Sequence, residues 1–582
     1  MKYSIAPAAS GYTQCDLSRN HVTTLDFGQI LPIAVDECII GDRHHVEISP
    51  FVRLAPMAVP TFGNFDLHLV SFFVPFYTIN PYFDNFVTGQ AIFGGIGTGN
   101  PRIRVDEFYN RLAASDSSQV KATAPDFYDF CLLGGTSKVL NYVVLNRKNR
   151  VVYKIMQMLG YPANSIDTTN YDLHLSNALC VLCFIKAFND WLSLASNYSN
   201  SIVSSFLASV RSNPSGTINS SSLVSVLQAI APLIGSDFFT SAYNGAVSAF
   251  ASPTNGSGTA MPLGFFDVLR GTITADNTVT NTDNDVNVNV SSGKLNSFSL
   301  NFLKSFDAFV RRNELAGTRP AQRILARFGI KSEDYRSNYA KLIDHTKIPF
   351  NVADVTATAA NADPALGLGT YAGQSVASGT FKFDFDCEDY GMLFTFAYID
   401  ARAMYKAPTF ACNLRKEALD YYQPEFDGVG MSPVSYSQLH SNPRAQVSGS
   451  YAPSNRNRVF GFVPRYEEYR TSFDLVTGDF ISFDTMDAWH FGRDLTVLRQ
   501  GDSPVLLPQS NEFQQIGQEF DRIFTTDVTN SSGDDTAYDH FFAVFNIKMN
   551  SERKMKSRPG SVNFKDGEIA ISSLGKTLNG VD

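Results

Sequence analysis

Two cysteines have the spacing of a redox or metal site. Cys180 and Cys183 form a CxxC pair, which needs a second ligand pair in a metal site and an exposed thiolate in a redox site. The pair lies instead on an apolar stretch with helical spacing, and the sequence has no matching second pair. We therefore expect two buried structural thiols.

Neighbouring carboxylates are the other candidates for catalysis, at Glu388/Asp389, Glu467/Glu468 and Asp534/Asp535. A glycosidase on a β-sandwich needs two acids held about 5 to 10 Å apart in a cleft, and adjacent turn residues do not establish that geometry. The sequence also lacks the Gly-x-Ser-x-Gly, His-Glu-x-x-His and phosphate-loop patterns. We predict no catalytic, cofactor or metal site.

Basic clusters beside aromatic residues fit the binding of single-stranded DNA, in which phosphates and base faces are both contacted. One cluster combines basic residues at 147–154 with Tyr142 and Tyr153, and a second follows the arginines at 311–327. The third is our first candidate for DNA contact and consists of Arg553, Lys554, Lys556, Arg558 and Lys565. A solvated face or intersubunit salt bridges are the alternative for each cluster.

Composition narrows the class of protein. The chain has 582 residues, 44% of them hydrophobic and 18% charged, which is typical of a globular protein. Its net charge of −9 disfavours a stand-alone nucleic-acid binder, so DNA would meet local basic patches or a separate basic protein. Seven cysteines, no apolar signal core in the first ten residues and no apolar run of roughly 20 residues predict cytoplasmic synthesis without membrane insertion.

The elements that would position these residues are mainly strands. Aromatic residues make up 13% of the chain and favour pleated sheet. Strands are predicted at 65–73, 381–387 and 541–547, and the segment 392–399 is expected to pair with 381–387 as a hairpin. Helices are predicted at 151–159, 181–194 and 302–315.

Strands at both ends of the chain, with helices and loops between them, predict a mainly β fold in which distant segments close a sandwich, as in a jelly roll. We expect an N-terminal arm at 1–25 and one sandwich domain at 26–582. Within that domain we expect a helical and loop insertion at 80–200, a surface projection at 197–300, a helical insertion at 301–345 and a basic tail at 545–582. The projection is rich in Ser, Asn, Thr and Gly, and nearly uncharged.

Several segments resemble, in the same order, those of one family. They are DE…GD at 36–42, FFVP at 72–75, DFFTSA at 237–242, the helical stretch at 313–336, the glycine-centred segment at 383–405, FGFVPRYEEYRTSFDLVTG at 460–478, DAWH at 487–490 and the basic pattern at 544–560. Together they are similar to the major capsid proteins of the Microviridae, and within them to the gokushovirus branch.

The resemblance implies an eight-stranded antiparallel jelly-roll sandwich with long helical and loop insertions, assembled as a T=1 icosahedral shell around circular single-stranded DNA. It implies that residues 197–300 form a protrusion, which we expect to serve host attachment. Expected partners are further copies of the chain, the DNA genome, a small basic DNA-binding virion protein, a minor or pilot protein and a host surface receptor. The expected location is the virion.

Four aromatic residues in the similar segments are predicted to lie in the core or in subunit contacts: Trp489, Phe460, Tyr466 and Tyr469. The competing hypothesis is a carbohydrate-binding or carbohydrate-active β-sandwich, which the aromatic content, the acidic balance and the Asn/Ser/Thr-rich loops also fit.

Overall fold

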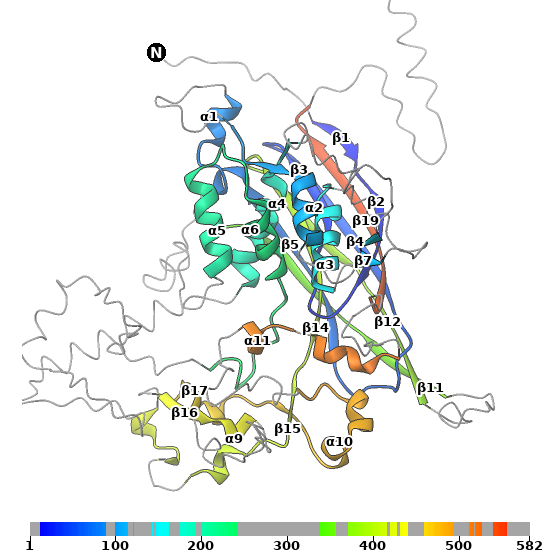
Figure 1. Ribbon diagram of the computed structural model, residues 1–582, viewed down its shortest axis with the longest axis vertical. Helices are drawn as coiled ribbons and strands as arrows, with labels where there is room; N and C mark the ends of the chain where they lie inside the picture. Colours follow the sequence, from blue (N-terminus) through cyan, green and yellow to red (C-terminus); the bar gives the residue numbers. More distant parts are fainter. Residues whose placement is uncertain are drawn as a thin grey trace, which may run out of the picture.

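The computed structural model describes fifteen stretches of the chain, and all structural statements below concern them. They are residues 12–88, 99–114, 120–121, 142–143, 147–161, 175–193, 201–242, 338–356, 371–415, 420–427, 431–439, 459–493, 511–516, 518–525 and 539–555. Two antiparallel sheets form the body of the molecule, helices cover one side, and a smaller module lies below (Figure 1).

The larger sheet is built around β4 (Arg43–Leu54) and β19 (Phe541–Arg553), which pair from Phe541 opposite Leu54 to Glu552 opposite Arg43. The far edge of β19 pairs with β1 (Thr13–Asp16) and β2 (Arg19–Leu25). The far edge of β4 pairs with β12 (Tyr371–Ser378) and β13 (Phe381–Asp386), and β12 continues to β11 (Asn351–Thr356). Segments more than 500 residues apart are therefore neighbours in this sheet.

The second sheet has the strand order β10-β5-β14-β3. Its strands are β3 (Ile30–Cys38), β5 (Phe65–Pro75), β10 (Lys341–Pro349) and β14 (Gly391–Ala401). Nearly every residue of β5 and β14 is buried, so both faces of these strands are covered. The continuous apolar runs of these strands reflect that double burial.

One hydrophobic core lies between the sheets. In β19 the inward residues are buried and the outward ones exposed, in strict alternation from Phe541 to Asn550. Rings cross the interface: Phe73 of β5 lies 4.9 Å from Phe385 of β13. Phe27, between β2 and β3, contacts five rings at 5.2–6.4 Å and closes one end of this core: Phe65, Phe491, Phe520, Phe524 and Phe541.

A helical layer covers the outer face of the smaller sheet (Figure 1). It contains α2 (Val105–Ala114), α3 (Arg147–Met158), α4 (Leu179–Ala187), α5 (Ser201–Ser212) and α6 (Ser220–Gln228). Phe184 of α4 packs 5.1 Å from Phe396 of β14, both nearly inaccessible. Helix α6 begins where the Asn219 side chain accepts a hydrogen bond from the Ser222 N–H.

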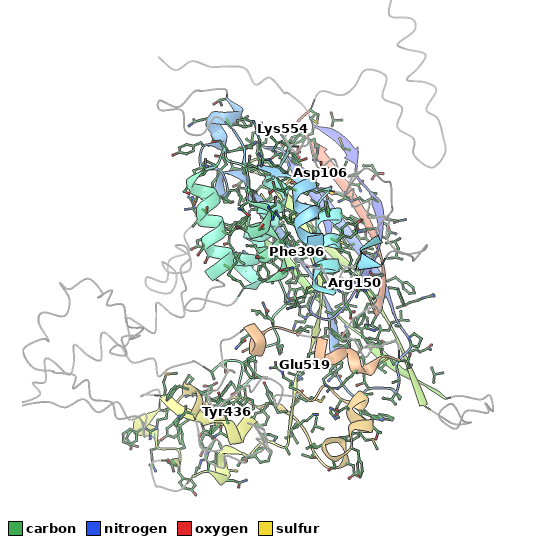
Figure 2. The ribbon with its side chains drawn as sticks, in the orientation of Figure 1. Asp106, Arg150, Phe396, Tyr436, Glu519 and Lys554 are labelled. Carbon is green, nitrogen blue, oxygen red and sulfur yellow. The ribbon has the colours of Figure 1, made fainter. Side chains whose placement is uncertain are left out.

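A smaller module contains its own cluster of buried aromatic residues, around Phe239, Tyr405 and Phe460. It includes β15 (Met404–Lys406), β16 (Met431–Ser435), β17 (Val459–Pro464), β18 (Asp474–Val476), α9 (Tyr436–Leu439), α10 (Asp479–Ser482) and the 3₁₀ turns η10 (Glu467–Tyr469) and η11 (Asp484–Trp489). In Figure 2, Tyr436 marks this module and Phe396 the main body.

The remaining elements are short connections. They are η1 (Phe76–Thr78), α1 (Phe83–Val87), β6 (Arg102–Arg104), β7 (Val120–Lys121), β8 (Tyr142–Val143), β9 (Leu175–Asn177), the π-helical turn η3 (Phe188–Leu192), η6 (Ala411–Asn413), η8 (Pro424–Phe426), α11 (Asn511–Gln514) and η12 (Gln518–Ile523).

The mainly β prediction is confirmed, as are the strands at 65–73, 381–387 and 541–547 and the helix at 151–159. The hairpin prediction is wrong: β13 pairs with β4 in one sheet, whereas β14 pairs with β3 and β5 in the other. The burial of the two strands differs accordingly. The outward residues of β13 are exposed, as in a sheet with one solvent face, whereas β14 is buried on both faces between the core and the helical layer. The connection crosses between sheets, and the Cys387 N–H donates to the Asp42 carbonyl at 2.7 Å.

Other expectations fall partly outside the described residues. Residues 13–25 of the expected arm form β1 and β2, which pair with β19 of the same chain. Residues 201–228 of the expected projection form α5 and α6 within the helical layer, and 243–300 lie outside the described residues. The predicted helix at 302–315, and with it the arginines at 311–327, also lies outside them, as do residues 556–582 of the tail.

Candidate nucleic-acid interface and subunit contacts

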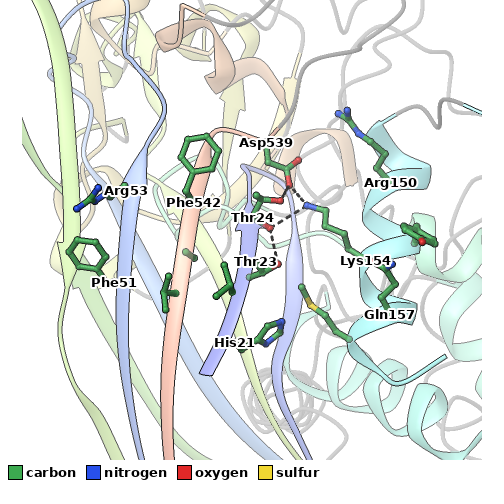
Figure 3. A pocket seen from close by; sticks show the side chains of 15 residues that line it. His21, Thr23, Thr24, Phe51, Arg53, Arg150, Lys154, Gln157, Asp539 and Phe542 are labelled. Carbon is green, nitrogen blue, oxygen red and sulfur yellow. Dashed lines mark hydrogen bonds and ion pairs between the residues drawn. The ribbon is translucent and has the colours of Figure 1, made fainter. Parts of the chain in front are cut away.

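A groove of about 750 Å³ lies between helix α3 and the outer face of the larger sheet. Strands β2, β4 and β19 supply the apolar side chains of Val22, Phe51, Phe542 and Val544, which point outward because the strands alternate. Figure 3 shows Arg150, Lys154 and Gln157 of α3 facing these strands. Because Val22 is 73% exposed and Phe51 and Phe542 about 40%, the groove offers apolar surface that the described residues do not cover.

The Lys154 ammonium is fixed inside the wall of the groove. It forms an ion pair with Asp539 and donates to the Gln29 side-chain oxygen at 2.9 Å and to the Thr24 carbonyl at 3.3 Å (Figure 3). Although burial alone would raise it, the pKa of the Asp539 carboxyl is lowered to about 2 by Lys154 and by hydrogen bonds from Thr24 and Gln29. Asp539 is therefore ionised at neutral pH, and Lys154 joins α3 to the sheet instead of facing solvent.

Two arginines, Arg53 and Arg150, are among the residues that line the groove. Arg53 lies over the Phe51 ring at 5.0 Å, and Arg150 projects from α3 beside Asp539 in Figure 3. His21 donates through its Nδ1–H to the Ile33 carbonyl at 2.7 Å. Apolar and aromatic surface beside guanidinium groups can bind an anionic partner with flat apolar parts, such as a nucleotide.

Of the predicted C-terminal cluster, the structure describes Arg553 and Lys554. Arg553 lies with Nε 3.3 Å from the Asp42 carboxylate and donates to the Glu37 carbonyl at 2.8 Å, so it holds the turn between β3 and β4. The Lys554 ammonium lies 5.4 Å from the Tyr12 ring. Lys556, Arg558 and Lys565 lie outside the described residues, and their DNA contact stays a prediction.

The four predicted core or assembly residues occupy different environments. Phe460 is buried against Phe513 at 5.1 Å, and buried Tyr466 donates to the Tyr421 carbonyl at 3.2 Å. Trp489 is half-buried and stacks on Phe62 at 5.5 Å. Tyr469 is 53% exposed, so in the isolated chain it is a surface residue. Its contact with another subunit stays a prediction.

Sequence reasoning missed the surface around Tyr469. Arg415 lies over the Tyr469 ring at 4.6 Å and donates to Glu468 at 3.3 Å. Tyr421 and Tyr422 nearby are about half exposed. The local signal is the pair of segments 421–426 and 465–470, both rich in aromatic residues, but nothing in either shows that they meet. Clustered Tyr and Arg are typical of protein interfaces.

The CxxC pair lies on α4, at the inner side of the helical layer. Burial raises the pKa of Cys180 to about 12 and raises that of Cys183 well above its ordinary value. Both groups therefore remain thiols at neutral pH, in agreement with the structural role expected for them. Within the described parts of the chain, no helix is long and apolar enough to span a membrane.

This chain is similar to known capsid proteins. A family model described as "Capsid protein (F protein)" matches residues 6–92 and 234–550, well over half of the chain. Capsid protein VP1 of Chlamydia phage 1 is 22% identical over 576 residues, which covers 85% of this chain and 89% of that protein. Capsid protein VP1 of Bdellovibrio phage phiMH2K is 21% identical over 185 residues, about a third of each chain.

Proposed function

The chain belongs to the capsid protein (F protein) family, and from this premise we propose that it forms a T=1 icosahedral shell around a circular single-stranded DNA genome. It is a major capsid protein of a phage of the Microviridae, similar to those of gokushoviruses, and it works as one of many subunits in the virion. The observation that carries this conclusion is the family match, because its two parts contain every strand of both sheets, and only the last three residues of β19 lie beyond it.

The sandwich is a jelly roll. Its eight strands in chain order are β2, β3, β4, β5, β10, the β12/β13 pair, β14 and β19, with β1 and β11 as additions at the edges. The orders β2-β19-β4-β13 and β3-β14-β5-β10 support this topology, because successive strands lie in opposite sheets except for β5 and β10, which pair with each other. The pairing of β2 with β19 joins segments that are more than 500 residues apart, so the inserted segments between them need not hold the sandwich closed.

DNA binds through local cationic surface and not through the whole charge of the subunit, which is negative. The groove beside α3 is the favoured surface among the described residues, since Arg53 and Arg150 border exposed Phe51 and Phe542. A small basic virion protein would supply the remaining counter-charge. Lys556, Arg558 and Lys565 are proposed as further contacts.

The DNA proposal is tested by replacing Arg53 and Arg150 with Gln and measuring the nuclease-protected DNA in purified particles. We expect shells that retain less circular single-stranded DNA after a salt wash. The matched control is Lys382→Gln, an exposed cation on the same sheet, which should leave the DNA content unchanged. Equal DNA content in the wild-type, arginine-substituted and Lys382→Gln particles would mean that the groove does not bind DNA. Duplex DNA in native particles would contradict the single-stranded genome.

Host attachment is assigned to the inserted segment within 197–300, synthesis to the host cytoplasm, and further contacts to a minor or pilot protein. Deleting residues 250–292 should leave shell formation largely intact and reduce binding to host cells. Loss of all particles would show that this segment is needed for assembly instead.

A further inference from the structure

Three buried residues with metal-ligating side chains meet at one end of the sandwich. Asp26 follows β2, Asp521 lies in η12, and His540 immediately precedes β19. One ligand atom of each lies within 4.8 Å of those of the other two, and each residue is at most 2% exposed. Sequence spacing gives no sign of this set, because its members come from opposite ends of the chain.

The surroundings hold these side chains in place. The Phe27 N–H donates to the Asp26 carboxylate at 2.9 Å, and the His540 ring stacks on Phe524 with centroids 4.2 Å apart and planes at 3°. His540 Nδ1 lies 3.1 Å from the Asp26 carboxylate. That separation is close to the spacing of two adjacent ligands bonded to one ion at about 2.0–2.2 Å. The imidazole Nδ1 and the Asp26 carboxylate thus face each other, within hydrogen-bond distance.

The charge of the set also favours a cation. Two ionised carboxylates and one imidazole are oxygen and nitrogen donors with a net negative charge, which suits a divalent cation. The nearby Lys154 ammonium interacts electrostatically with Asp26, but it is already bonded to Asp539. A divalent ion would add positive charge next to both carboxylates.

We propose that Asp26, Asp521 and His540 bind one divalent transition-metal ion, Zn²⁺ or Mn²⁺. Carboxylate oxygen with imidazole nitrogen suits these ions, whereas Ca²⁺ takes oxygen ligands alone. Binding requires the ligand atoms to move closer together, since two ligands of one ion lie roughly 3.0–3.5 Å apart when adjacent and about 4.2 Å apart when opposite. The ion ties the end of β2, the start of β19 and η12 together, and because the site is buried it enters during folding.

The test begins with the wild-type chain, expressed in medium supplemented with Zn²⁺ and Mn²⁺, purified as particles and analysed for metal by mass spectrometry. We expect about one equivalent of one of the two ions per chain. The protein is then unfolded and refolded with EDTA, with Zn²⁺ or with Mn²⁺, and the melting temperature should be higher with the correct ion. Less than roughly a tenth of an equivalent, together with identical melting curves in all three arms, would overturn the proposal.

Variants locate the ion. His540→Gln and Asp521→Asn should each reduce the bound metal at least tenfold, and the added ion should no longer raise the melting temperature. His45→Gln is the control, because His45 is an exposed histidine on the same sheet that also faces a carboxylate, Asp384 at 2.7 Å. If the metal content of both site variants equals that of the control, the ion binds elsewhere and the assignment is wrong. If the variants do not fold, the wild-type refolding arms decide.

Discussion

The ion pair between Lys154 and Asp539 makes a quantitative prediction. The Lys154 side chain is 16% exposed and that of Asp539 is 5% exposed, so the pair joins α3 to the start of β19 in a largely dry environment. Lys154→Met keeps most of the aliphatic volume but leaves the carboxylate buried without its counter-ion. Removing one partner of a buried pair typically costs about 3–5 kcal/mol, and we expect a loss of that size in the free energy of unfolding.

The assay is guanidinium denaturation of dissociated subunits, followed by the fluorescence of Trp191 and Trp489. The control is Lys382→Met, which breaks an exposed pair with Glu47 at 3.4 Å and should cost at most about 1 kcal/mol, because Lys382 is 65% exposed. The double variant Lys154→Met/Asp539→Asn removes both charges and should recover roughly 2–3 kcal/mol relative to the sum of the single changes.

Two results would refute this reasoning. One is a loss for Lys154→Met no larger than that for Lys382→Met, which would mean that Lys154 is solvated. The other is additivity of the two changes in the double variant, which would mean that Lys154 and Asp539 do not interact.

Three further predictions concern other parts of the molecule. Phe27→Ala removes the ring that five others contact and should cost about 3–5 kcal/mol of subunit stability, so an unchanged melting temperature would contradict its role in the core. Trp489→Ala should reduce particle yield in sedimentation, because it removes the stack on Phe62, and a wild-type yield would count against a core or interface position. Burial lowers the pKa of His68 to about 3 and raises that of Asp400 to about 6. On acidification from pH 7 to 5, His68 therefore gains a proton in the unfolded chain but not in the folded one. Asp400 behaves in the opposite way, because its carboxyl is protonated in the folded chain before it is protonated in the unfolded one. The protonation of unfolded His68 destabilises the fold, and that of folded Asp400 stabilises it. Between pH 7 and 5 the free energy of unfolding of His68→Gln should therefore rise by about 2 kcal/mol relative to that of the wild type. If the two free energies change in parallel with pH, the pKa assigned to His68 is wrong.

Strands that are exposed on one face could be predicted from sequence. The alternation in β13 follows from Phe at every second position with polar residues between, and β19 is visible as an apolar, aromatic-rich run, both without any knowledge of the partner strand. Helix α3 follows from its apolar spacing in the same way. The predicted hairpin of β13 and β14 was wrong. Two strands joined by a short connection usually pair with each other, but the fully buried β14 belongs to the other sheet.

The candidate site was harder to predict because its partners are distant in sequence. Lys154 looks like a phosphate-binding cation until Asp539, 385 residues away, is placed beside it. Arg553 looks like part of a basic tail until the turn that contains Asp42 comes next to it. Positive residues in a sequence indicate where charge is, but only the fold determines which charges are already neutralised by a buried carboxylate.

The central claim is that this chain is a self-assembling shell protein, and electron microscopy of the purified, recombinantly expressed chain tests it most directly. The account predicts closed particles of one size with icosahedral symmetry, whose reconstruction has T=1 geometry. A protein that stays monomeric at every concentration, ionic strength and pH tested, or that forms only open aggregates, would contradict it.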